Sequence, residues 1–221
     1  MFKYTKSKYA KLLLEDNIVR VGTLYGFRDM EAKPGISDPL EGSYLNKIKI
    51  DTLDTAKTPI TPQLRSNLSG IMSITDSLPF PCTIRGFTHV KAYTSPNCLI
   101  FCVSHQKSKK TMQQFKDADT CIEIYDPDKF FTLLNRSVLK KLKNKVKWRG
   151  AFDVRYGNYE RMQANPYDRP LHPAIVKTKD FSEQHEMRAI WLPKAPVTLQ
   201  PFYDLKVPGM KSCCRLIELD H

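Results

Sequence analysis

Alternating apolar and polar residues divide the chain into short strands, with helical periodicity in only a few places. Residues 2–5 form an aromatic run that predicts a short strand, and residues 18–22 alternate as a half-buried strand does. Between them, residues 7–17 carry an apolar stripe that predicts a helix. Ser7 is the expected N-cap of that helix, and Asn17 suits the left-handed residue that ends it.

The central part of the chain predicts further strands on either side of one long loop. Residues 44–51 and 83–93 alternate, while residues 98–103 are apolar throughout, as expected for a central strand. Residues 53–69 are rich in Thr, Pro, Ser and Asn and contain Pro59. This stretch predicts a long loop, which would lie beside the substrate in an enzyme and would otherwise be a solvated insertion.

The second half of the chain contains the clearest helix. Asp126 is its expected N-cap, Pro127 is its first residue, and its apolar residues form one buried face. Shorter elements are expected as well: a basic helix over residues 107–117, a turn capped by Ser182, and strands over residues 120–125, 152–156, 187–192 and 214–219. These elements predict one α+β domain over residues 1–221 with a mixed or mainly antiparallel sheet.

The composition indicates a globular protein. The chain has 221 residues, of which 41% are hydrophobic and 10% aromatic, enough for one large domain with a core. No apolar run is long enough to span a bilayer, and the lysine-rich N-terminus lacks the apolar core of an export signal. We therefore expect a cytoplasmic protein without a membrane partner. The six cysteines do not have the spacing of a metal site and are expected to be buried thiols.

The charge of the chain favours a polyanionic partner. The net charge is +12, from 35 basic and 23 acidic residues, although a basic surface also serves solubility. Basic residues gather at and beyond the end of the predicted helix: Lys140, Lys141, Lys143, Lys145, Lys147 and Arg149. One interpretation is a nucleic-acid site in which Lys141, Lys145, Lys147 and Arg149 bind phosphates and Trp148 stacks on a base. The other is a solvated helix end whose cations suit the helix dipole.

Motifs that occur in the same order along the chain resemble two known families. The aromatic opening, followed by a short helix and a strand, is similar to the start of the ADP-ribosyltransferase superfamily, whose members have His or Arg where this chain has Lys3. The opening also resembles a bacterial family of unknown function that begins Tyr-x-Tyr. Residues 37–42 match that family's Asn-Asp-Pro-Phe-(Asp/Glu)-Gly loop, residues 185–191 match its closing Glu-x-Glu-x-Arg strand, and residues 121–124 match part of its middle motif.

The resemblance implies a fold like that of ADP-ribosyltransferases, with a split sheet around a cleft, a few flanking helices, and NAD as a substrate. Lys3 takes the position that contacts the adenosine ribose or a phosphate, with Tyr4 and Thr5 beside it on the first strand. Glu186 takes the position of the catalytic carboxylate, which holds the nicotinamide ribose and stabilises developing positive charge. The alternative role for Glu186 is an ion pair with Arg188.

Three further residues are candidates for NAD contacts. Arg20 is placed to meet the pyrophosphate, and Tyr25 follows the second strand, where it would cover the nicotinamide. His105 lies where a buried strand ends, which is a common position for site residues, although an ordinary surface histidine fits the same pattern. For Tyr4 and Tyr25 the alternative is a core aromatic.

These observations favour an NAD-dependent ADP-ribosyltransferase, a bacterial or phage toxin or antiphage defence effector that modifies nucleic acid and pairs with an antitoxin. The alternative is a noncatalytic nucleic-acid-binding module of a defence system. A metal-dependent nuclease would use Asp38, Glu41 and Glu123, whose spacing does not support a metal site. The sequence contains no Walker loop, GxGxxG loop, HExxH helix or GxSxG elbow, so the commonest hydrolase and dehydrogenase interpretations lack their motifs.

Overall fold

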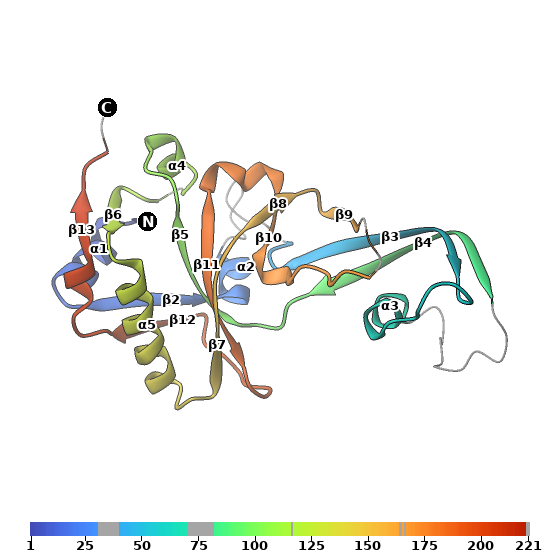
Figure 1. Ribbon diagram of the computed structural model, residues 1–221. Coiled ribbons are helices and arrows are strands. Elements are labelled where there is room, and N and C mark those ends of the chain that lie inside the picture. Colours follow the sequence, from blue (N-terminus) through green and yellow to red (C-terminus); the bar gives the residue numbers. More distant parts are fainter. Residues whose placement is uncertain (31–39, 70–81, 116, 164, 166, 220–221) are drawn as a thin grey trace.

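The protein consists of a sheet-based body from which a long two-stranded arm projects (Figure 1). The computed structural model describes residues 1–30, 40–69, 82–115, 117–163, 165 and 167–219. The expected α+β class is confirmed, because strands outnumber helices and most strand pairs are antiparallel. The described strands do not close into a barrel.

The body is built on an eight-stranded sheet in which neighbouring strands are antiparallel. Its strands are β1 (Phe2–Thr5), β2 (Ile18–Thr23), β5 (Leu99–Ser104), β6 (Thr120–Ile124), β7 (Val146–Asp153), β11 (Glu186–Pro193), β12 (Phe202–Lys206) and β13 (Cys214–Ile217). The apolar run of β5 lies at the centre, in contact with β1, β2 and β11. β13 lies at one end of the sheet and pairs with β6, which confirms the edge strand that the sequence predicts near the C-terminus.

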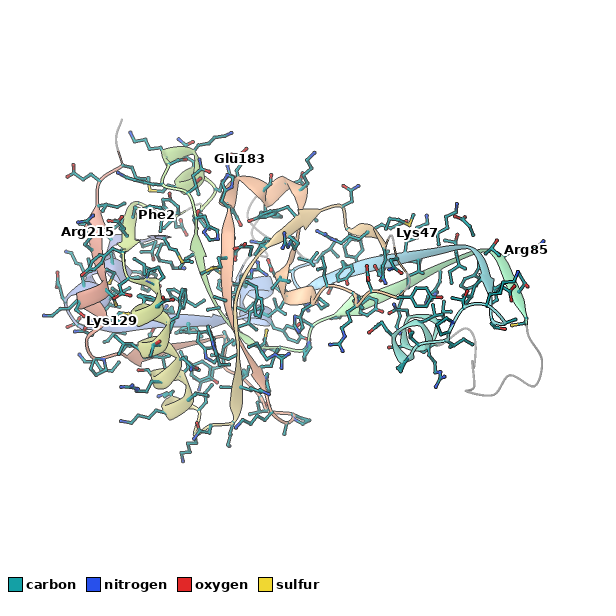
Figure 2. The ribbon with its side chains drawn as sticks, in the orientation of Figure 1. Phe2, Lys47, Arg85, Lys129, Glu183 and Arg215 are labelled. Atoms are coloured by element: carbon teal, nitrogen blue, oxygen red, sulfur yellow. The ribbon has the colours of Figure 1, made fainter. Side chains whose placement is uncertain are left out.

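The arm is formed by β3 (Ser43–Asp54) and β4 (Thr83–Thr94), and β9 (Glu160–Gln163) runs parallel to the first half of β3. Figure 2 shows Lys47 and Arg85 along this arm, away from the body. The prediction of a long loop over residues 53–69 is wrong, because α3 (Pro62–Leu68) forms there with Thr61 as its N-cap. Leu64 and Leu68 of α3 pack on the buried side chains of β3 and give the arm a small core of its own.

Helices cover one face of the body sheet. α1 (Ser7–Leu14) and α5 (Pro127–Lys141) place their apolar sides in the largest core of the protein. Asp126 caps α5 as predicted, since its side chain accepts a hydrogen bond from the backbone N–H of Lys129. The remaining elements are short: α2 (Leu24–Met30), α4 (Lys109–Gln113), β8 (Arg155–Gly157), β10 (Val176–Thr178), and the 3₁₀ turns η1 (Pro173–Ile175), η2 (Lys179–Gln184) and η3 (Met210–Cys213).

Several local predictions need correction. Ser7 is not the N-cap of α1 but its first residue, and its backbone N–H and hydroxyl both donate to the Asp119 carboxylate. The turn near Ser182 begins at Lys179 and is not capped by Ser182. The basic residues after α5 do not extend the helix, because the chain turns and Val146–Asp153 forms β7. Asn17, in contrast, has the predicted left-handed conformation, with φ of 51°.

Candidate functional site

A wedge opens in the body sheet beside β5. β11 pairs with β5 along its whole length, from Trp191↔Leu99 to Glu186↔Ser104, so β1 and β2 share the other edge. β2 pairs there only at Leu99 and Ile100, and β1 pairs only at Ser104. None of the described strands bonds to the middle of this edge, between the stretch paired with β2 and the residue paired with β1.

A pocket of about 170 Å³, which we call the wedge pocket, lies where β1 and β2 diverge. Lys3 and Thr5 line it from β1 and Arg20 lines it from β2, so the fold brings these three candidate NAD contacts together. Aromatic side chains supply further walls: Tyr9, Phe27, Phe101 and Phe202. Since a cavity of about 150 Å³ accommodates benzene, the wedge pocket has room for one flat ring but not for a whole dinucleotide.

Lys3 reaches from β1 across the wedge. Its Nζ donates a hydrogen bond of 2.9 Å to the Cys102 carbonyl of β5 and lies 4.9 Å from the centroid of the Phe101 ring. Burial lowers the pKa of Lys3, and the nearby Glu186 carboxylate opposes part of that shift. The ammonium therefore satisfies a carbonyl on the unpaired stretch of β5 and supplies a desolvated cation at the pocket wall.

Arg20 lines the wedge pocket but is already engaged. Its Nε and Nη2 donate to the two carboxylate oxygens of Asp204 at 2.7 and 2.6 Å, and its Nη1 donates to the Tyr9 hydroxyl at 2.9 Å. The guanidinium also stacks 4.0 Å from the centroid of Phe202. A pyrophosphate contact from Arg20, as predicted from the sequence, would have to replace Asp204.

Glu186 lies on the other side of β5, in a group of four buried charged side chains that we call the ionic cluster: Glu41, Lys177, Glu186 and Arg188. The Glu186 oxygens lie 2.7 Å from Arg188 Nε and 3.0 Å from Lys177 Nζ. Glu41 completes the cluster, at 2.5 Å from Arg188 Nη1 and 3.7 Å from Lys177 Nζ. The exposure of each side chain is 7% or less, so water does not compete for these ion pairs.

The cluster holds Glu186 in its ionised form. Burial alone would raise the pKa of the Glu186 carboxyl, but Arg188 and Lys177 outweigh burial and keep that pKa well below its usual range. Burial would likewise lower the pKa of Lys177, but the carboxylates of Glu186 and Glu41 raise it above its usual value. Two carboxylates and two cations therefore balance one another inside the protein.

Glu186 does not line the wedge pocket. It lines a crevice of about 10 Å³ together with Lys3, Tyr4 and Cys102, and Lys3 is shared between this crevice and the wedge pocket. A space of this size holds one water molecule at most. Lys3 therefore stands between the predicted catalytic carboxylate and the pocket that would receive a ligand.

The ionic cluster joins two motifs that lie far apart in the sequence. Glu41 belongs to the loop motif of residues 37–42, of which residues 37–39, including Asp38, lie outside the described part of the chain. Glu186 and Arg188 belong to the late strand motif, and the predicted alternative of an ion pair between them is present, although buried rather than on the surface. Lys177 was missed by sequence reasoning, since a single lysine in a short strand carries no pattern.

The structure places Tyr4 away from the wedge pocket. Its hydroxyl donates to the Gln106 carbonyl at 2.5 Å and accepts from the backbone N–H of Ser108 at 2.9 Å. Its ring stacks on Phe115 with centroids 5.6 Å apart. These contacts anchor the loop that follows β5, so Tyr4 has the core role that was the alternative to NAD binding.

Tyr25 and His105 are also outside the wedge pocket. The Tyr25 hydroxyl donates to the Ser95 carbonyl at 3.3 Å, and the Arg28 guanidinium lies 4.5 Å from its ring centroid. His105 Nε2 lies 2.7 Å from an Asp153 oxygen in an exposed pair. The fold therefore does not place Tyr25 or His105 at the wedge pocket, where the sequence predicted that they would contact NAD.

The predicted nucleic-acid residues are divided between two elements. Lys141 ends α5, Lys145 lies in the turn, and Lys147 and Arg149 are exposed on β7. Trp148 points to the opposite face, where its ring centroid lies 4.7 Å from that of Trp191 and 6.5 Å from that of Phe131. Trp148 is therefore partly buried against the main core, on the face opposite Lys147, and its stacking on a base stays a prediction.

In comparisons with known proteins, no protein-family model, curated protein or solved structure matches the chain. Among the helices that the structure describes, none combines the length and apolar character needed to cross a membrane. The described residues also contain no group of three or more His, Cys, Asp or Glu side chains arranged to hold a metal ion.

Proposed function

We propose that this protein is an NAD-dependent ADP-ribosyltransferase that modifies nucleic acid, with the wedge pocket as its NAD site. The observation that carries this proposal is the meeting of Lys3, Thr5 and Arg20 in one aromatic-walled pocket beside the Glu186 crevice. The aromatic walls suit a nicotinamide or adenine ring, and the Lys3 ammonium suits a phosphate group. The rest of the dinucleotide would lie along the open mouth of the wedge.

ADP-ribosyl transfer breaks the bond between nicotinamide and its ribose and joins that ribose carbon to an oxygen or nitrogen of the acceptor, which gives up a proton. Positive charge develops on the ribose as nicotinamide leaves, and an ionised carboxylate stabilises that charge. Glu186 is in the required ionised state. For the ribose to reach it, the Lys3 ammonium must leave the Cys102 carbonyl and turn toward a phosphate of NAD.

The test is incubation of the purified protein with NAD labelled in its adenylate phosphate, in the presence of RNA, DNA or cell protein. We expect label on nucleic acid, and a loss of about 100-fold or more in the transfer rate for Glu186→Gln, as for removal of other transition-state stabilisers. Absence of transfer to every acceptor by the wild-type protein would contradict the proposal.

Lys3 offers a matched pair of variants that avoids disturbing the ionic cluster. Lys3→Arg restores the residue type found in the superfamily and is expected to retain transfer, whereas Lys3→Met removes the cation and is expected to raise the KM for NAD. Thermal unfolding of each variant checks that the fold persists. Equal activity of Lys3→Met and wild type would show that Lys3 takes no part.

The second candidate is a nucleic-acid-binding module without catalysis. One observation favours it: the charge of Glu186 is already balanced by Arg188 and Lys177, and its carboxylate is closed off from the wedge pocket. A module of this kind would bind RNA or DNA in a salt-sensitive manner without NAD and would transfer no label. The same incubation therefore separates the two candidates.

A further inference from the structure

The basic segment that follows α5 is an edge strand rather than a helix end, and this changes what its residues can bind. Among the described strands β7 pairs only with β11, so its other edge is open. Lys147 pairs with Leu192, whereas Trp148 pairs with Trp191, so the lysine and the indole lie on opposite faces of the sheet. Lys147 is exposed on the face that does not carry the main core.

A β-bulge at Arg149 brings Phe152 onto the face that carries Lys147. The register shifts between Ile190 and Trp191, whose partners are Gly150 and Trp148, so Arg149 is the extra residue of the bulge. Alternation after Lys147 places Arg149 on this face, the bulge adds Phe152 to it, and both line a cavity of about 190 Å³. Within the part of the chain that the structure describes, neither Lys147 nor Arg149 takes part in an ion pair.

The walls of this cavity, which we call the β7 pocket, are mostly apolar and aromatic. Ile175, Ile190 and Leu192 line it, and Phe152 and His172 complete the wall. Phe152 is 39% exposed, so a ligand can reach its ring.

Two local features keep this wall open and uncharged. Phe152 lies across Gly150, whose φ of 124° favours glycine and where a Cβ would stand 3.0 Å from the Phe152 ring. Burial and the charge of Arg149 lower the pKa of His172, which leaves its imidazole neutral at pH 7.

We infer that the β7 pocket and the cations of β7 bind single-stranded nucleic acid, with one unstacked base against Phe152 and the backbone phosphates on Arg149 and Lys147. An aromatic platform beside a row of cations is the arrangement by which proteins hold single strands without regard to sequence. The cavity is large enough for one flat ring, and a base inside a duplex is not free to enter it. RNA and DNA both offer this surface a flat base and phosphodiester groups, so either can be the ligand.

In the proposed transferase, this surface would bind the nucleic-acid acceptor. Only the chemistry after binding depends on the proposed function. Binding itself is measured on the full chain without NAD, by fluorescence anisotropy of labelled oligouridylate and oligothymidylate of about 12 nucleotides and of a duplex of the same length. Failure of binding and failure of ADP-ribosyl transfer are then separate results.

We expect wild-type protein to bind the single strands more tightly than the duplex. Phe152→Ala is expected to weaken binding about 5- to 150-fold, which corresponds to the loss of one stacked base. Lys147→Ala combined with Arg149→Ala is expected to lower the slope of log affinity against log salt by about 0.7 for each phosphate that the protein no longer neutralises. If oligouridylate binds more tightly than oligothymidylate, RNA is the preferred source, and the reverse order indicates DNA.

Two control variants match these changes elsewhere on the surface. Tyr125→Ala removes another exposed aromatic residue, and Lys8→Ala combined with Lys11→Ala removes two exposed cations from α1. The aromatic control is expected to weaken single-strand binding less than Phe152→Ala does. The cation control is expected to weaken it less than the double change at Lys147 and Arg149 does. Binding that is equally weakened by the controls, equally tight for duplex, or absent for both single strands would overturn the inference.

Discussion

The two faces of β11 are equally buried and chemically opposite. On one face, Met187, Ala189 and Trp191 join the main core with exposures of 6% or less. On the other face, Glu186 and Arg188 are exposed by 3% and 2%, and they carry full charges. The same backbone therefore holds an apolar core on one side and the ionic cluster on the other.

Burial alone does not explain the ionic cluster. A buried set of ion pairs is often no more stable than well-packed hydrophobic side chains of the same volume, although breaking it is strongly unfavourable. The apolar face stabilises the folded state directly by burying hydrophobic surface. The charged face joins three separate segments: the Glu41 loop before the arm, Lys177 of β10, and β11. We expect the cluster to fix how these segments meet beside the Glu186 crevice.

The largest effect is expected from Arg188→Met. This change leaves Glu41 and Glu186 buried with one cation between them, and breaking buried ion pairs of this kind costs about 3–5 kcal/mol. Urea unfolding followed by circular dichroism measures the loss. Replacing all four charges by Leu or Met is the informative companion, because it is expected to be neutral or stabilising by about 1–4 kcal/mol. If this fourfold variant is as unstable as Arg188→Met, the charges themselves stabilise the fold.

On the apolar face, Met187→Ala is expected to cost about 2–5 kcal/mol, because the variant buries less apolar surface and leaves a cavity behind. The same urea titrations measure it. Since no charge is involved, the loss is expected to be the same at pH 7 and at pH 4. A loss that changed with pH would show that the two faces are coupled through the strand.

The elements of this fold were largely predictable from the sequence, whereas their arrangement was not. Alternation and the Asp126-Pro127 cap are local signals, so most strands and α5 were predicted close to their observed positions. The pairing of β5 with three other strands depends on contacts between distant residues, which no local pattern records. The wedge pocket follows from that pairing, and so does the meeting of Lys3 with Arg20.

The basic segment shows why residue type was an insufficient guide to the site. The sequence identified a cation-rich stretch with an aromatic residue, and both are present. A strand places alternate residues on opposite faces, so Trp148 turns into the core while Lys147 faces out. Phe152 and the bulge at Arg149 became recognisable only once the register of β7 against β11 was known.

A smaller effect, distinguished by its pH dependence, is expected from Glu186→Gln. The pKa of Glu186 in the folded protein is lowered from the usual 4.5, so its stabilising contribution is present above pH 4.5 and is lost as pH falls toward the folded pKa. The variant should therefore be less stable than wild type near neutral pH, and the difference should narrow as the pH is lowered below 4.5. Urea midpoints measured from pH 7 to pH 3 test this, with Met187→Ala as the pH-independent reference. A constant difference would mean that the charge of Glu186 is not what stabilises the fold.

The smallest effect is expected from Asp204→Asn, which weakens the ion pair with Arg20 at the wedge pocket. This pair has bidentate geometry as good as any in the ionic cluster, but its side chains are 33% and 40% exposed. Water screens exposed pairs, and they contribute about 0.2–1 kcal/mol. The contrast with Arg188→Met isolates burial as the variable, because both changes disturb a carboxylate–guanidinium pair within the same sheet. If Asp204→Asn lowered the unfolding free energy as much as Arg188→Met, pairing geometry rather than burial would set the stability of both sites, and the distinction between the two faces of β11 would lose its physical basis.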